Sequence, residues 1–228
     1  MEESLRNQIS KTSRDATGER QVGSARALNL PRIVLASTSP RRAEILRTVG
    51  WPFETFPVEV DESRNRGEGA QAYVERLACE KAGAAAPNFP SRIVLGADTV
   101  VVVDNEILGK PEDESQARRI LRDLGGRWHQ VLTGVALIGI TNNDNAIVAH
   151  AATDVKFAMM GEAEIDWYVS SGEPMDKAGA YAIQGLGARF IEEIKGEYFN
   201  VMGLPVRLLY DLITRAREEN EISRTTSP

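Results

Sequence analysis

The stretch Ile93–Val103, which reads IVLGADTVVVV, decides the fold. Valine and isoleucine favour a pleated, packed surface, and so apolar a run predicts a strand covered on both faces of its sheet. Asp98 interrupts the run, and a carboxylate taken out of water costs several kcal/mol unless it is paired, hydrogen-bonded or bound to a metal. Two interpretations stay open: Asp98 is a functional group at a break in the strand, or it begins a turn.

The composition is that of one ordinary globular domain. The chain has 228 residues, 42% hydrophobic and 26% charged, which is enough for one sizeable core and does not require a second. No apolar run approaches the roughly 18 residues of a membrane span, so we expect no membrane contact. The formal net charge of -6 argues against a nucleic-acid-binding surface, because phosphate neutralisation requires an excess of lysine and arginine.

Cysteine and histidine are scarce. Cys79 is the single cysteine, which excludes an intramolecular disulfide and a cysteine-based zinc site. A lone cysteine suits a reducing compartment, so we expect a cytoplasmic protein. His129 and His150 are too few for a histidine-rich metal site, and we interpret both as structural or surface residues.

The two ends of the chain are polar. Residues 1–30 lack clear periodicity, which is typical of a disordered extension, and residues 218–228 are similarly polar. We therefore expect one folded domain at residues 31–217, with a disordered segment on either side.

Residues 31–50 predict a strand, a loop and a helix in that order. Pro31–Ala36 is a short apolar strand. Ser39 is suited to cap the helix, Pro40 to occupy its first turn and Gly50 to end it.

Two arginines in the first turn of this helix are unusual. Arg41 and Arg42 place positive charge at the positive end of the helix dipole, although the free N–H groups there are ready to receive an anion. Together with the hydroxyl of Ser37, the two guanidinium groups predict a phosphate-binding site. The alternative is a pair of solvated arginines on a helix face.

The rest of the chain alternates between strands and helices. Prolines interrupt residues 51–60, which suits an edge strand, and a hairpin turn follows at residues 104–106. Apolar periodicity predicts helices at 70–85, 113–124, 162–171 and 205–217, and strands at 131–140, 146–157 and 189–194.

Three further charged positions are candidates for a site. Asp61 and Glu62 follow the edge strand, where such a pair begins a turn or holds a hard cation. Lys81 lies on the apolar stripe of its helix, where a lysine either extends to solvent or approaches a bound phosphate. Lys110 precedes a proline and is therefore held extended.

Residues 172–187 differ in composition from the rest. The segment is rich in glycine and alanine and carries Lys177 and Gln184. Small residues allow a backbone to approach something planar or anionic, and the amide of Gln184 offers the donor and acceptor that recognition of a base edge requires. The alternative is a flexible loop that binds nothing.

These candidates share one chemistry. Four or five cations with two carboxylates are what a polyphosphate with a divalent ion requires, one carboxylate serving to orient or deprotonate water. The sequence lacks the Gly-x-x-x-x-Gly-Lys-Ser/Thr motif, so we do not expect a P-loop enzyme. The candidate set is Arg41, Arg42, Glu62, Lys81, Asp98, Lys110, Lys177 and Gln184.

Eight motifs between residues 32 and 215 resemble, in the same order, those of the Maf family of nucleoside triphosphate pyrophosphatases. They are LASTSPRR (35–42), VDE (60–62), KA (81–82), GADTVV (96–101), LGKP (108–111), HQVLTGV (129–135), DKAGAYAIQG (176–185) and NVMGLP (200–205). So many motifs in one order make the resemblance specific.

This resemblance implies an α/β fold of the ITPase-like (Maf/Ham1) kind: a mixed twisted sheet with flanking helices and two lobes around a cleft. It implies hydrolysis of a nucleoside triphosphate substrate to the monophosphate and pyrophosphate, with Mg²⁺ or Mn²⁺ as cofactor. AYAIQG at residues 180–185 is similar to the branch that acts on dTTP and UTP, whereas the 7-methyl-GTP branch tends to carry Glu in place of Gln184. A homodimer and a role in clearing the nucleotide pool, modified pyrimidines included, are further expectations.

Carried over residue by residue, the resemblance also implies roles in the site. Asp98 is the proton acceptor that activates water, and Glu62 with Asp98 holds the metal. The expected specificity residues are Arg41, Thr99 and Gln184, and the expected phosphate-binding residues are Ser37, Arg42, Lys81 and Lys110. The alternatives are a nucleotide-binding regulator of cell division without turnover, and a 7-methyl-GTP pyrophosphatase.

Overall fold

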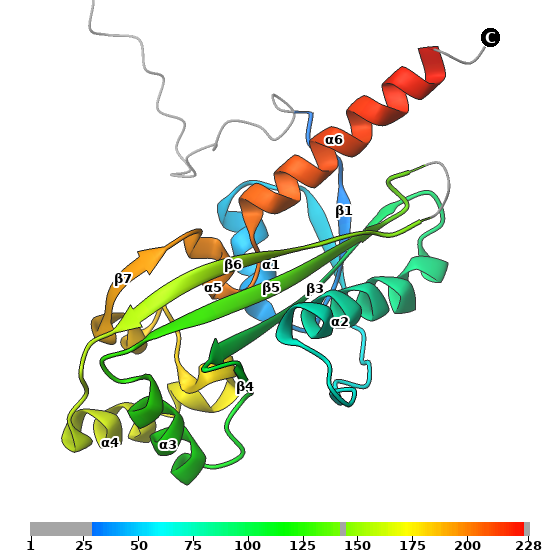
Figure 1. Cartoon of the computed structure of the whole chain (residues 1–228). Coiled ribbons are helices and arrows are strands. Elements are labelled where there is room, and N and C mark those ends of the chain that lie inside the picture. The colour runs from blue at the N-terminus through cyan, green and yellow to red at the C-terminus, as the bar shows by residue number, and fades with distance from the viewer. Residues whose placement is uncertain (1–28, 142–144, 226–228) are drawn as a thin grey trace, which may run out of the picture.

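A mixed seven-stranded sheet forms the centre of the molecule (Figure 1). The computed structural model describes residues 29–141 and 145–225. The strands are β1 (Ile33–Ala36), β2 (Phe53–Phe56), β3 (Ile93–Val103), β4 (Glu106–Leu108), β5 (Trp128–Ile138), β6 (Ile147–Phe157) and β7 (Ile191–Lys195). Their order is β2-β1-β3-β5-β6-β7, and β4 pairs with β3.

Helices cover both faces of this sheet. The α-helices are α1 (Pro40–Thr48), α2 (Ala70–Ala85), α3 (Glu114–Leu124), α4 (Glu162–Ser170), α5 (Tyr198–Met202) and α6 (Val206–Thr225). Short 3₁₀ turns are η1 (Ala86–Asn88), η2 (Glu173–Asp176), η3 (Ala178–Ala180) and η4 (Leu186–Phe190). No helix in the described ranges is long and apolar enough to cross a bilayer.

The strand order reverses beside β1. From β1 the chain passes through α1 to the parallel strand β2 on one side, and then through α2 to β3, parallel to β1 on the other side. Open α/β sheets bind ligands outside the carboxyl ends of their strands at such a reversal. The short strand β2 lies at the edge of the sheet, which confirms the position predicted from its prolines.

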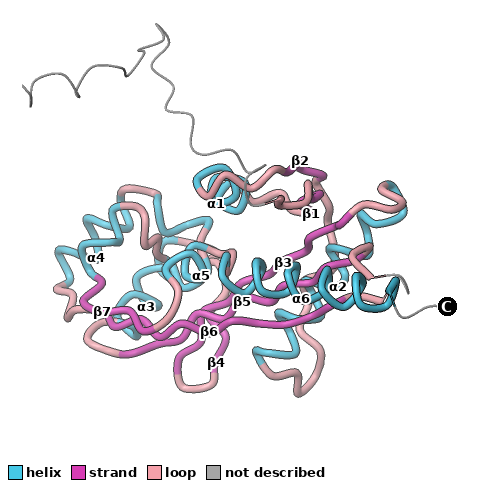
Figure 2. Tube along the Cα trace, turned by 90° about the horizontal axis from the view of Figure 1, so that it is seen from above, coloured by secondary structure: helices cyan, strands magenta, loops and turns pink. Residues whose placement is uncertain are grey.

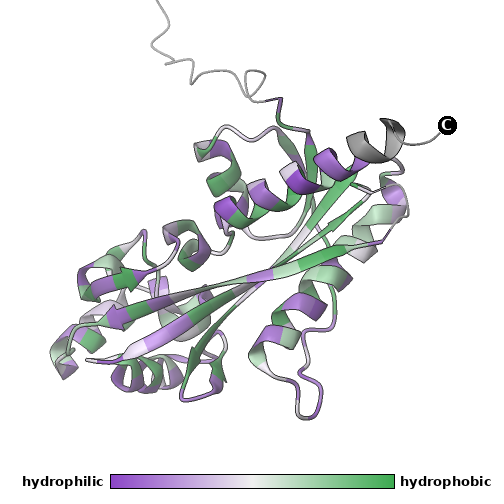
Figure 3. Cartoon of the chain, turned by 45° about the horizontal axis from the view of Figure 1, so that its top comes forward, coloured by the Kyte–Doolittle hydropathy of each residue, from purple (hydrophilic) through white to green (hydrophobic). Residues whose placement is uncertain are grey.

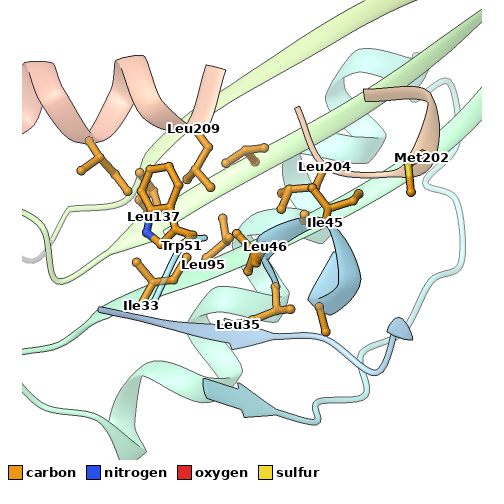
Figure 4. Packing of buried hydrophobic residues seen from close by; sticks show 14 of the residues in the cluster. Ile33, Leu35, Ile45, Leu46, Trp51, Leu95, Leu137, Met202, Leu204 and Leu209 are labelled. Carbon is orange, nitrogen blue, oxygen red and sulfur yellow. The ribbon is translucent and has the colours of Figure 1, made fainter. Parts of the chain in front are cut away.

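Side chains alternate between the two faces of β1 and β3, as a pleated strand requires. On one face, Leu35 and Leu95 pack with Leu209 of α6 and with residues of α1 (Figure 4). On the other face, Val34 and Val94 pack against the alanines of α2. The sheet is therefore buried on both faces at this end, as its apolar sequence predicts.

The long strands β5 and β6 connect this end of the molecule to a second lobe. There Leu121 of α3, Phe157 of β6 and Tyr168 of α4 belong to a separate buried cluster. Figure 2 shows α3, α4 and β7 grouped at one end of the sheet, and Figure 3 shows the strands as most hydrophobic at the end near α6. The expected α/β architecture, with two lobes on one mixed sheet, is confirmed.

Two glycines allow α2 to lie directly on the sheet. A Cβ atom at Gly96 would overlap the carbonyl oxygen of Ala78 and lie 2.7 Å from the amide nitrogen of Ala82. A Cβ atom at Gly134 would lie 2.8 Å from the amide nitrogen of Glu75. Because backbone occupies that space, the absence of a side chain at these two positions fixes how closely α2 approaches β3 and β5.

The structure corrects the prediction at β3. Asp98 pairs with Gly134 and Thr99 with Thr133 in an unbroken ladder with β5, so neither a strand break nor a turn occurs there. Asp98 tolerates the interior of a strand because its side chain finds a partner across the gap to α2.

The predicted ends of the domain also need correction. Helix α6 runs to Thr225, so most of the tail expected to be disordered at 218–228 is helical. Strong helix formers such as Arg217, Glu218 and Glu219 follow Ala216, and residues 217–225 contain neither glycine nor proline. The short helix α5 was not predicted at all. The extension expected at 1–30 lies outside the described residues, apart from Asn29 and Leu30.

Substitution of Gly96 by Ala should destabilise the fold, because its methyl group would force α2 away from β3. We expect a loss of about 1–3 kcal/mol in the free energy of unfolding, measured by urea denaturation. Gly83→Ala is the matched control: Gly83 lies in α2, and a Cβ atom there would meet no atom within 4 Å beyond its chain neighbours and the nearby backbone of its own helix. This substitution should be neutral or stabilising by about 0.5–1 kcal/mol. Equal denaturation midpoints for wild type and Gly96→Ala would contradict the role given to the close approach of α2.

Candidate active site

A cleft of about 800 Å³ opens along one edge of β3. On that edge β1 pairs with β3 as far as Gly96, and β4 pairs with it from Val101 onward. Within the described sheet, no strand pairs with residues 97–100 on this edge, so this part of β3 forms a wall of the cleft. The cleft lies at the carboxyl end of β1, where the strand order reverses.

All of the site residues predicted from the sequence line this one cleft. They come from segments far apart along the chain, and the fold brings them together around the open edge of β3. The residues are Ser37, Arg41, Arg42, Glu62, Lys81, Asp98, Thr99, Lys110, Lys177 and Gln184.

Lys81 joins two carboxylates at the floor of the cleft. Its Nζ donates to Oδ1 of Asp98 and to Oε1 of Glu62, each at 2.7 Å. The Lys81 and Asp98 side chains are only 10% and 12% exposed, whereas that of Glu62 is 53% exposed. Lys81 therefore does not extend to solvent from its apolar stripe; it neutralises the buried carboxylate of β3.

The cations of the cleft favour an ionised Glu62. Partial burial opposes ionisation, but the hydrogen bond and charge of Lys81, with the charges of Lys110 and Arg42, lower the pKa of the Glu62 carboxyl below its usual value. Beside Lys81, Glu62 thus keeps a negative oxygen ligand in the cleft at neutral pH.

The buried guanidinium of Arg42 makes three hydrogen bonds. Nε donates to the carbonyl oxygen of Gly203 at 2.8 Å, Nη1 to Oγ of Ser37 at 3.2 Å, and Nη2 to Oγ1 of Thr99 at 3.1 Å. Burial lowers its pKa, although an arginine side chain stays protonated at any physiological pH. The alternative of a solvated arginine is therefore wrong for Arg42, because all three bonds are to buried or half-buried groups.

Asp98 and Thr99 point to opposite faces of β3, as neighbours in a strand must. Asp98 faces Lys81 of α2, whereas Thr99 faces Arg42 of α1. Both residues line the cleft because the edge of the strand between them is open. The cleft therefore reaches around the edge of β3 and has access to both faces.

The mouth of the cleft carries a second charged cluster. Arg41 Nη1 lies 3.1 Å from Oδ2 of Asp176, and Lys177 also donates to this carboxylate. Asp176 is well exposed, so the ion pair contributes little to stability, but it links the start of α1 to η2 across the mouth.

The start of α1 differs in one detail from the prediction. The side chain of Ser39 makes no capping hydrogen bond. Instead, the backbone N–H of Ser39 donates to Oγ of Ser37 at 3.1 Å. The first-turn amides of α1 are thus not capped by Ser39, and they lie beside the cleft with Arg41 and Arg42. Such amides suit an anionic ligand.

Tyr73 and Arg76 of α2 hold the loop that carries Glu62, and the sequence analysis gave neither a role. The Tyr73 hydroxyl donates to the carbonyl oxygen of Glu62 at 2.7 Å, and Arg76 donates to that of Ser63 at 3.0 Å. Arg76 also forms a two-pronged ion pair with Glu68. The available signal was the position of Tyr73, on the same helix stripe as Lys81.

A buried polar network behind the cleft was also missed. Thr99 Oγ1 lies 3.0 Å from Oγ1 of Thr133, which donates to the carbonyl oxygen of Asn200 at 3.2 Å. Asn200 is fully buried, and its Nδ2 bonds to β5 at Val131 and to β6 at Thr153. The network ties α5 to the sheet, and an asparagine within the apolar NVMGLP segment was the signal for it.

The carboxylate oxygens of the cleft can hold a hard divalent cation only together with oxygens of a bound substrate. Within the described ranges no group of three or more His, Cys, Asp or Glu side chains is placed to hold a metal. Lys81 engages one oxygen each of Asp98 and Glu62, so it does not occupy the second oxygen of either carboxylate. Mg²⁺ is commonly held by one or two carboxylates together with substrate phosphates, and Asp98 and Glu62 supply two that lie side by side on Lys81.

The chain matches one protein family over most of its length. The family described as Maf-like protein matches residues 32–216. The chain belongs to the Maf family. Three relatives named dTTP/UTP pyrophosphatase come from Symbiobacterium thermophilum, Clostridioides difficile and Yersinia pestis, and are 50%, 48% and 46% identical to this chain. The matches cover 82%, 80% and 80% of this chain and 94%, 94% and 91% of those proteins.

Solved structures outside this close group show a weaker likeness. The Ham1 protein of Staphylococcus aureus aligns with the Maf-family chain at a TM-score of 0.42 and 17% identity. The alignment covers 70% of this chain and 93% of that protein.

His129 supports one wall of the cleft, and its protonation should be visible in solution. Its Nε2 lies 2.8 Å from the hydroxyl of Tyr181, a cleft residue, and burial lowers its pKa from 6.5 to about 4. Because the unfolded chain then binds a proton more readily than the folded one, stability is complete above about pH 6.5 and declines towards pH 4, by about 3 kcal/mol from this residue. An NMR titration of the His129 ring checks this, and a midpoint near 6.5 would contradict it.

Proposed function

We propose that this chain is a nucleoside triphosphate pyrophosphatase that hydrolyses dTTP and UTP, canonical or modified, to the monophosphate and pyrophosphate. The observation that carries the proposal is the Asp98–Lys81–Glu62 group, in which a buried lysine and a buried aspartate meet a more exposed glutamate, in a cleft lined by further cations. The names of relatives 46–50% identical to the chain give the substrate class. The volume of the cleft, about 800 Å³, is ample for a nucleotide.

The phosphates would lie between the start of α1 and the end of β4. Arg42 and Ser37 are held together by their mutual hydrogen bond, and the uncapped amides of α1 lie beside them. Lys110, two residues after the end of β4, is exposed and lines the cleft, and Lys81 is buried there. The three cations can neutralise a triphosphate, and the hydroxyl and amides can donate to its oxygens, as charge moves onto the leaving pyrophosphate.

Asp98 is the proposed proton acceptor. Its carboxylate is buried in a rigid strand, faces the cleft and is held by Lys81, so its position is fixed before a substrate binds. In the reaction, an attacking water gives its proton to Asp98, its oxygen bonds to phosphorus, and the bond to the pyrophosphate group breaks. The ammonium of Lys81 offsets the charge of Asp98 and lies close enough to donate to a phosphate oxygen as the substrate enters.

Glu62 and Asp98 would hold Mg²⁺ or Mn²⁺ through the oxygens that Lys81 does not engage. When bound, such an ion neutralises phosphate oxygens and polarises the phosphorus centre.

The base would lie towards the mouth of the cleft. Gln184 is exposed and offers both a donor and an acceptor, and Arg41, at the start of α1, lines the same cleft. The hydroxyl of Thr99 is already bonded to Arg42 and Thr133, so we assign its influence on the substrate to its hold on Arg42. The homodimer expected for the family remains a prediction.

The test is pyrophosphate release by the purified chain from dTTP, UTP, CTP and 7-methyl-GTP with Mg²⁺ or Mn²⁺. We expect turnover of dTTP and UTP above the other two, and a loss of about 100-fold or more in kcat for Asp98→Asn, because a positioned general base contributes about 10²–10⁴. Asp123→Asn is the matched control, since Asp123 is exposed on α3, away from the cleft.

Three results would contradict the proposal. Nucleotide binding without turnover would favour the regulator, and preference for 7-methyl-GTP would assign the other branch of the family. Full activity of a folded Asp98→Asn variant would overturn the role of Asp98.

A further inference from the structure

The glycine-rich segment after η3 is ordered around an internal anion. Its small residues allow approach to something planar or anionic, and the structure shows a carboxylate of the same chain there. Oε2 of Glu173 accepts from the amide of Leu186 at 2.8 Å, and Oε1 accepts from the amide of Gly187 at 3.0 Å. Glu173 lies at the start of η2, 13 residues before Leu186 in the sequence.

Two glycines are required by this contact. A Cβ atom at Gly185 would lie 2.7 Å from Oε1 of Glu173 and closer still to Oε2. A Cβ atom at Gly187 would lie 2.5 Å from the hydroxyl oxygen of Tyr168. Gly185 and Gly187 both have negative φ, so neither is required here by a left-handed backbone conformation. Their function in the fold is to let the carboxylate and the hydroxyl reach the backbone.

Tyr168 extends the same contact to the other side of Gln184. Its hydroxyl donates to Oε1 of Glu173 at 2.7 Å and accepts from the amide of Ala182 at 3.1 Å. The segment is thus held at Ala182 before Gln184, and at Leu186 and Gly187 after it. Between these anchors the side chain of Gln184 is exposed at the cleft.

The charge on Glu173 suits this task. Partial burial opposes its ionisation, but two backbone N–H groups, the hydroxyl of Tyr168 and the charge of Lys177 together lower its pKa. An ionised carboxylate offers acceptors to all three donors at once, and hydrogen bonds to a charged group are the strong ones.

We propose that Glu173 is a positioning residue that fixes the backbone around Gln184, and through it determines which bases the cleft accepts. The inference rests on the proposed function, in which Gln184 reads the base. Glu173 does not line the cleft and does not contact the substrate; it acts through the segment 182–187.

The test substitutes Glu173 by Gln. A carboxamide has one acceptor oxygen, so its NH₂ group would face the amide of Leu186 or Gly187, and at least one anchor is lost. We expect the KM for dTTP to rise more than kcat falls, and the ratio of kcat/KM for dTTP to that for 7-methyl-GTP to drop by about ten-fold to a hundred-fold. Amide hydrogen exchange at residues 182–187 should become faster without nucleotide. Glu192→Gln, which alters an exposed ion pair with Lys156, is the matched control.

Two further variants separate positioning from general damage to the fold. Tyr168→Phe keeps the ring in its cluster but removes the link to Ala182, so it should reduce the same ratio to a smaller degree. In a Gln184→Ala background, Glu173→Gln should cause no further loss of the ratio. If Glu173→Gln does not fold, the Tyr168→Phe result decides.

Unchanged exchange at 182–187, an unchanged substrate ratio in either variant, or a further loss of full size in the Gln184→Ala background would overturn the inference. A wild-type chain that turns over none of these triphosphates would instead contradict the proposed function, and the exchange result would still decide whether Glu173 orders the segment.

Discussion

The ammonium of Lys81, 2.7 Å from both Asp98 and Glu62, is the interaction on which the rest of the site depends. A carboxylate in the middle of a buried strand is stable only with a partner, and the partner comes from α2. Helix α2 reaches it because Gly96 and Gly134 leave space for its backbone against the sheet. Two absent side chains in the core thus set the geometry of a charged group at the cleft.

The cleft itself follows from the strand register. Helices α1 and α2 lie on opposite faces of the sheet, and β3 loses the neighbour on one edge between Gly96 and Val101. A strand with one open edge presents Asp98 to one face and Thr99 to the other. A ligand at this edge can meet Lys81 and Arg42 together, although the two belong to different helices on different faces. The fold therefore places cations from helices on both faces of the sheet around one cleft.

The sequence predicted most elements and a set of residues that all line one cleft, and it failed where the answer depends on register or on small contacts. The periodicity of α2 and the apolar run of β3 can be read from neighbouring residues in the sequence. Asp98 and Lys81 could be predicted because each belongs to a sequence motif. The unbroken path of β3 through Asp98 is not local, because it depends on pairing with Gly134 of β5. Similarly, glycines at 185 and 187 signal close approach, but nothing in the sequence says that the approaching group is Glu173. Helix α5 was not predicted, because a helix of five residues shows too little hydrophobic periodicity to detect.

The most direct test of this account is a double-mutant cycle on kcat for pyrophosphate release, using Lys81→Met, Asp98→Asn and the double variant. Methionine keeps most of the lysine stem in the packed region of α2 while removing the charge. Residues that act as one unit show strongly non-additive effects. We expect the double variant to be about as slow as the slower single variant. Losses that multiply would show that Lys81 and Asp98 act independently, and would contradict the central role given to their contact.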